Sequence, residues 1–267
     1  MKAAFSLVEL SIVLVILGLL TGGILGGQSL IRAAELRTVG SDYQKYVTAT
    51  YSFRDKYFAL PGDMPNATAF WGVAAGSGSD TTCYNTVSTG GTATCNGNGD
   101  GNYCNTFQQC YEGHRYWQHL ANAGLIEGRF TGAGTNAADR QVGAYPGVSA
   151  PILKMSRTTF QMMNLTRGGG TTDYAYDAPN ITSGYYFGAV TCSTGCGPNT
   201  AILKAEEAWN IDVKTDDGRP AYGKVQSYKY GNTAVPGTGN CATSATASAA
   251  EYNLADQSIG CALMLAM

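Results

Sequence analysis

The stretch FSLVELSIVLVILGLLTGGILGGQSLI, residues 5–31, decides how this chain is built. From Leu10 to Ile31 it carries no charge, and about 20 apolar residues are enough to cross a bilayer as a helix. A single carboxylate, Glu9, interrupts the apolar start. A charge in hydrocarbon is costly, so it marks a functional position that needs a partner. The stretch therefore predicts a transmembrane helix with one functional acid near its beginning.

Only four residues, Met1 to Ala4, precede this stretch. A secretory signal peptide has its small-residue cleavage site after the apolar run. Here the small residues come before it, so cleavage between Ala4 and Phe5 leaves the anchor on the mature chain. Lys2 is the only basic residue ahead of the span, which places the N-terminus in the cytoplasm and the rest of the chain on the far side.

The short basic leader, the small residue, Phe5 and then Glu9 as fifth mature residue resemble the type IV pilins and type II secretion pseudopilins. That family usually has Gly where this chain has Ala4. The resemblance implies a leader of residues 1–4, a cut by prepilin peptidase and N-methylation of Phe5. It also implies that Glu9 pairs with the amine of Phe5 when subunits assemble. An ordinary signal anchor with Glu9 at the membrane interface is the alternative.

Later blocks of the chain, such as LPGDMPNATAFWG and NGNGDGNY, also look like those of large bacterial pilin-like proteins. The resemblance implies a structural filament subunit, in contact with copies of itself or other pilins. Such a subunit is first anchored in the inner membrane with its head in the periplasm, and it later becomes part of a periplasmic or cell-surface filament. Pilus and pseudopilus are not separated. The alternative function is a membrane-anchored exported binding domain, adhesin-like, that does not polymerise.

The helical pattern continues past the apolar stretch as a one-sided stripe through residues 32–58. Its apolar members are Leu36, Val39, Tyr43, Tyr46, Val47, Phe53 and Tyr57. The segment Leu60–Asp63, LPGD, is a helix breaker. The stripe needs a globular partner, which residues 59–267 can supply. We therefore expect an α+β fold, in which a long helix packs on a head with an antiparallel sheet and disulfide-tied loops.

The net charge and the short motifs of the chain argue against several functions. The net charge of −2 gives no sign of a nucleic-acid-binding surface. The segment Gly218–Lys224 nearly matches a phosphate-binding loop, but Val225 stands where Ser or Thr must hold magnesium. No nucleophile motif appears, so the chain is not expected to be an enzyme.

Eight cysteines, all beyond residue 80, are typical of an exported domain in an oxidising compartment. Eight cysteines allow 105 pairings, so the pairs predicted here rest on local spacing alone. They are Cys83–Cys95, Cys104–Cys110, Cys192–Cys196 and Cys241–Cys261.

Two acidic loops are candidates for calcium, which prefers oxygen ligands from a tightly curved loop. The first alternates oxygen-bearing residues with glycines, and its candidate ligands are Asn96, Asn98, Asp100 and Glu112. The second groups Asp212, Asp216 and Asp217 beside a Gly turn. An ion-free Asn/Gly turn and a solvated helix end are the respective alternatives. Zinc on Cys104, Cys110, His114 and His119 is disfavoured, because the cysteine spacing is wrong.

Periodicity also places the elements of the head. It predicts helices over 112–123 and 200–214, and strands over 183–191 and 225–230. In the second helix Leu203, Ala208, Trp209 and Val213 are expected to face the core. The low-complexity segment 237–250 is expected to form a C-terminal loop tied by a disulfide.

Overall fold

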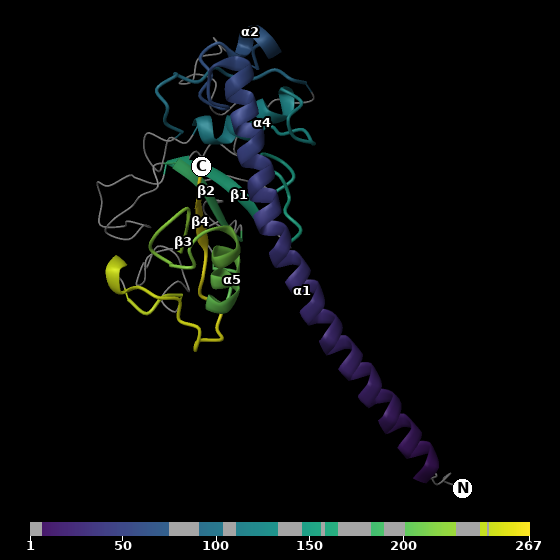
Figure 1. The fold of residues 1–267 in the computed structure, drawn as a ribbon. Coiled ribbons are helices and arrows are strands. Elements are labelled where there is room, and N and C mark those ends of the chain that lie inside the picture. The colour runs from purple at the N-terminus through teal and green to yellow at the C-terminus, as the bar shows by residue number, and fades with distance from the viewer. Residues whose placement is uncertain are drawn as a thin grey trace.

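The computed structural model describes residues 7–74, 91–103, 111–132, 146–155, 158–164, 183–189, 201–227, 241–244 and 246–267. Figure 1 shows one long helix, α1, whose N-terminal part extends far beyond a head that packs against its C-terminal part. The head contains a small antiparallel sheet and several short helices, so the fold is α+β as predicted.

Helix α1 runs unbroken from Leu7 to Tyr57, which at 1.5 Å per residue is a rod of roughly 75 Å. It ends where the sequence predicts, because Phe58 takes a left-handed backbone with φ 53° and the LPGD breaker follows. Its second half buries one face, formed by residues three or four positions apart: Val39, Tyr43, Tyr46, Ala49, Thr50 and Phe53. The predicted stripe is therefore confirmed as the face that holds the head.

The sheet has four strands in the order β1-β2-β4-β3, and all neighbours are antiparallel. Their bounds are Thr158–Asn164 for β1, Ser183–Ala189 for β2, Val225–Ser227 for β3 and Leu263–Ala266 for β4. β2 and β3 fall inside their predicted ranges. β1 and β4 are not among the predicted strands, and β4 lies in the sheet interior between β2 and β3.

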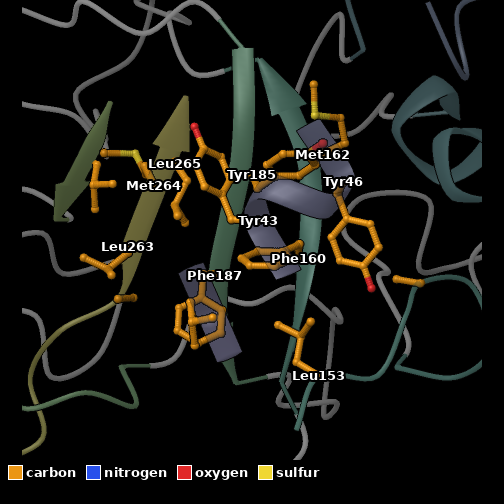
Figure 2. Close-up of a cluster of buried hydrophobic side chains, with 14 of the residues drawn as sticks. Tyr43, Tyr46, Leu153, Phe160, Met162, Tyr185, Phe187, Leu263, Met264 and Leu265 are labelled. Carbon is orange, nitrogen blue, oxygen red and sulfur yellow. The ribbon is translucent and has the colours of Figure 1, made fainter. Parts of the chain in front are cut away.

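The sheet and α1 share an aromatic core, shown in Figure 2. The Tyr46 ring lies edge-on to the Phe160 ring of β1, with centroids 5.9 Å apart, and Tyr43 meets Tyr185 of β2 edge-on at 6.1 Å. The Tyr43 hydroxyl also donates to the carbonyl of Ala266 in β4. Helix and sheet are thus joined by both packing and a partly buried hydrogen bond.

Helix α4, Tyr111–Asn122, lies against the upper part of α1 and confirms the predicted helix in this region. Trp117 and Leu120 are fully buried, and Gly124 follows the helix with φ 73°, the left-handed conformation of a helix-ending glycine. The short helix α2, Ala67–Trp71, caps the far end of α1, where the Trp71 ring packs on Tyr57 at 5.5 Å.

Helix α5, Ala205–Thr215, begins five residues later than predicted and packs beside α1. The expectation that Trp209 and Val213 face the core is wrong, since they are 36% and 47% exposed. The buried face of α5 is made by Ala205, Ala208, Ile211 and Asp212. Because a helix turns 100° per residue, this face leaves Trp209 at its edge and Val213 in solvent. Leu203 and Ala208 are buried, as expected.

A disulfide joins Cys241 to Cys261, the pair expected from spacing, and both residues are buried. Cys95 is also disulfide-bonded. The loop between Cys241 and Cys261 contains a short 3-10 helix, η2, Ala247–Ala249. The predicted pairs Cys104–Cys110 and Cys192–Cys196, and Cys83 of the remaining pair, lie outside the described residues.

Candidate functional site

The free part of α1 presents an apolar surface. Large apolar side chains between Leu7 and Ile31 are 48–85% exposed, and none of this apolar part of the helix is buried. The helix is long and apolar enough to cross a membrane, as an anchor or a signal segment. Glu9 lies in its first turn. Ala4 and Phe5, the predicted processing residues, lie outside the described residues.

Five glycines form an open surface on this part of α1. Gly18, Gly22 and Gly26 are four residues apart, as are Gly23 and Gly27, and a Cβ atom added to any of them would meet nothing within 4 Å. Small residues at this spacing let a neighbouring helix approach closely. The surface is thus suited to contact with other helices as well as with lipid.

The first predicted metal loop folds around an acid that sequence reasoning missed. Asp63, Asp100 and Glu112 each offer a carboxylate oxygen, and these atoms lie within 4.8 Å of one another. Asp63 comes from the LPGD turn. The loop that carries Asp100 can approach the LPGD turn this closely because residue 97 is glycine. A Cβ atom at that position would lie only 2.4 Å from the Cα of Asp63.

Backbone amides of the loop hold these acids in place. Gly99 and Gly101 donate to the two carboxylate oxygens of Asp63, at 2.6 and 2.9 Å, and Asn98 donates to Glu112 at 2.8 Å. Burial nevertheless raises the pKa of Asp63, with the nearby charge of Asp100 adding to the effect. A cation at this position would favour the ionised form.

The two predicted asparagine ligands have other contacts. Asn96 accepts a hydrogen bond from the backbone of Thr68 at 2.8 Å, at the start of α2. Asn98 forms hydrogen bonds within its own turn. Its side-chain oxygen accepts from the backbone amide of Asp100 at 2.8 Å, and its side-chain NH₂ donates to the Asp100 carboxylate at 3.1 Å. The structure therefore gathers Asp100 and Glu112 of the predicted set, together with Asp63.

The second predicted cluster is gathered as expected, at the C-terminal end of α5. Asp212, Asp216 and Asp217 bring carboxylate oxygens within 4.8 Å of one another. Asp212 is fully buried, and it accepts from the Tyr252 hydroxyl at 3.0 Å and from the amide of Gly218 at 3.1 Å. Burial, together with the charges of the two neighbouring acids, raises the pKa of Asp212 to about 7.

The second cluster lies at the C-terminal end of a helix. A helix C-terminus carries partial negative charge, which disfavours carboxylates there. Backbone amides offset part of this charge, as Asp217 accepts from Arg219 at 2.8 Å and Asp216 from Val225 at 3.4 Å. Both clusters supply only oxygen donors, which suits a hard cation such as Ca²⁺ and does not suit zinc.

We predict that calcium raises the melting temperature of the full chain in detergent, because a ligand that binds only the folded state stabilises it by about 2.7 kcal/mol at 100 times its Kd. The variants Asp63→Asn and Asp216→Asn assign the effect to one cluster. Asp256→Asn is the control, since that partly exposed acid belongs to neither cluster. Identical melting curves in calcium and in chelator would show that neither cluster is a site.

His119 is a structural residue of the core. Its Nδ1 accepts from the amide of Gly62 at 2.9 Å and its Nε2 lies 3.0 Å from the Thr94 hydroxyl, so both nitrogens are engaged. Its ring stacks on Phe53 with centroids 6.3 Å apart. Burial, assisted by the charge of Arg115, lowers the pKa of His119 to about 3.

This pKa predicts acid sensitivity. The folded state keeps the imidazole neutral, whereas the unfolded chain takes up a proton below the ordinary pKa of 6.5, so stability is lost as the pH falls from 6.5 toward 3. Between pH 7 and pH 5 this residue should lower the free energy of unfolding by about 2 kcal/mol. In His119→Gln, denaturant unfolding should show a pH dependence smaller by that amount. An unchanged pH dependence would contradict the buried neutral imidazole.

Comparison with known proteins identifies no relative: no family model, no curated protein and no solved structure matches the chain.

Proposed function

We propose that the chain is a structural subunit of a bacterial type IV pilus-like or type II secretion pseudopilus filament. The observation that carries this proposal is α1, a single helix from Leu7 to Tyr57 whose first half exposes apolar side chains while its second half is built into the head. A rod of this kind needs lipid around its free half before assembly and neighbouring helices around it afterwards.

The free half of α1 supports both environments. Its large apolar side chains would match a bilayer core about 30 Å thick. Its open glycines offer a surface on which helices of neighbouring subunits can pack closely in a filament. The head would lie in the periplasm before assembly and form the outer surface of the filament afterwards. Calcium held by either acidic cluster would stabilise the head.

The test is electron microscopy of filaments sheared from cells with and without this chain. Filaments that contain it, or that disappear when it is removed, support the proposal. A chain that stays in the membrane fraction while no filament depends on it would favour an anchored binding domain that does not polymerise.

Processing gives a separate prediction. Mass spectrometry of the mature chain should find Phe5 at the N-terminus, carrying an added methyl group, because the small residue Ala4 directly precedes the apolar run. Retention of residues 1–4, or a cut on the C-terminal side of the span, would contradict the prepilin interpretation.

A further inference from the structure

A groove of about 260 Å³ lies between α1 and α5. The two helices run side by side where α1 leaves the head (Figure 1). One wall is the α1 surface and the other is the second half of α5. The lining residues are Ala33, Leu36, Arg37, Gly40, Asn210, Ile211, Lys214 and Thr215.

The groove begins directly after the apolar span. Ile31 is the last residue of the uncharged stretch, and the α1 residues that line the groove are Ala33 to Gly40. At 1.5 Å per residue they lie about 3 to 13 Å beyond Ile31 along the helix axis. The headgroup layer on each side of a bilayer is roughly 5–8 Å thick. In a membrane-anchored chain the groove therefore starts at the depth of the lipid headgroups, and its far end lies just outside them.

Two cations line this groove without an acidic partner. Arg37 and Lys214 are exposed, and within the described parts of the chain neither takes part in an ion pair. Arg32, five residues before Arg37 on α1, is different. Its guanidinium forms two hydrogen bonds to Glu207 of α5, at 2.6 and 2.8 Å, and a third to the carbonyl of Ile202 at 2.9 Å.

The contacts of Arg32 keep the groove open and cationic. They tie α1 to the beginning of α5 and so set the distance between the two walls. They also occupy Glu207: burial acts to raise its pKa, but the hydrogen bonds from Arg32 and from the Lys204 amide outweigh burial and lower it. Arg32 thus engages Glu207 and also pairs with Glu35 at 3.6 Å, which leaves Arg37 and Lys214 available to an outside anion.

The remaining walls are mixed in character. Leu36, Ile211 and Ala33 provide an apolar surface, while Asn210 and Thr215 provide polar groups. A phospholipid has the same mixture, with an anionic phosphate, polar headgroup atoms and an apolar glycerol-ester region. A free phosphate ion would use the cations but leave the apolar wall uncovered.

We infer that this groove binds the headgroup of an anionic phospholipid from the periplasmic leaflet while the subunit is anchored in the membrane. The inference rests on the membrane anchoring of the proposed function. Arg37 and Lys214 contact the lipid phosphate, and the apolar wall contacts the glycerol and first acyl carbons. Binding would fix the rotation of the head against the membrane surface before assembly.

The experiment uses the full chain in nanodiscs of phosphatidylcholine with a minor fraction of phosphatidylglycerol, and counts retained lipids by native mass spectrometry. Two cations near a surface predict phosphatidylglycerol enrichment of about 30-fold over its bulk fraction. The double variant Arg37→Gln/Lys214→Gln should lose this enrichment. The control is Lys45→Gln/Arg54→Gln, which removes the same charge from exposed positions farther along α1 and should retain it.

The contradicting outcomes are distinct. A chain that enters nanodiscs but retains both lipids in their bulk ratio overturns the lipid site alone, as does equal loss in the two double variants. Displacement of the lipid by millimolar inorganic phosphate shows a site for the free ion and also overturns it. A chain that does not enter nanodiscs contradicts the membrane anchor of the proposed function, and the lipid site with it.

Discussion

Replacement of Glu9 by Gln is expected to leave export, disulfide formation and membrane anchoring intact, and to reduce incorporation into filaments about tenfold or more. Glu9 lies in the first turn of α1, within the exposed apolar part of the helix. Its carboxylate and the mature amine of Phe5 must both leave water when the subunit enters a filament. Each alone costs several kcal/mol in hydrocarbon, whereas a close pair recovers much of that cost.

The pair would also link processing to assembly, because the amine of Phe5 exists only after cleavage. An incoming subunit whose Glu9 has no partner is penalised, and this penalty would set the axial register of the filament. Ser11→Ala is the matched control, since Ser11 lies half a turn further along α1 and its hydroxyl donates to the carbonyl of Val8 in the same helix.

Two measurements on the same Glu9→Gln cells separate assembly from peptidase recognition. The mass of the N-terminus reports cleavage, and the amount of the chain in sheared filaments reports incorporation. Normal cleavage with reduced incorporation supports the ion pair. Normal cleavage with wild-type incorporation contradicts it, and absent cleavage places the role of Glu9 at the peptidase.

The elements predicted correctly from the sequence are those with strong local signals. The second half of α1 has a clear 3.6-residue stripe and a Pro-Gly breaker, and its buried face contains the expected Val39, Tyr43, Tyr46 and Phe53. β4 has no such signal. Its four residues, LMLA, are too short for periodicity to distinguish strand from helix, and only pairing with β2 and β3 makes them a strand.

The same limit applies to the acidic sites. The second cluster could be predicted from spacing alone, because its members Asp212, Asp216 and Asp217 are neighbours in sequence. Asp63 joins Asp100 only through the close passage of Gly97 over the LPGD turn, a contact between distant parts of the chain. The sequence shows Asp63 only as an acid next to a glycine in a turn. Its spacing does not indicate which loop folds around it.

The disulfide between Cys241 and Cys261 is expected to have the largest effect on stability of the contacts described in the head. It closes a loop with a sequence separation of 20, and the chain-entropy model assigns such a loop about 3 kcal/mol. That is a large share of the roughly 5–15 kcal/mol that stabilises a typical domain. The bond also secures the start of β4, because Cys261 exchanges backbone hydrogen bonds with Leu203, at 2.9 and 3.1 Å.

The variant Cys241→Ala/Cys261→Ala should therefore unfold at lower denaturant, with a free energy of unfolding lower by about 3 kcal/mol. Alanine suits both buried sites and leaves no free thiol to pair with other cysteines. The single variants decide the cause, since each already removes the whole cross-link. If the bond carries the effect, either single variant loses nearly as much as the double. If the two single losses simply add up to the double loss, they report side-chain packing, and the cross-link is not what stabilises the C-terminal strand.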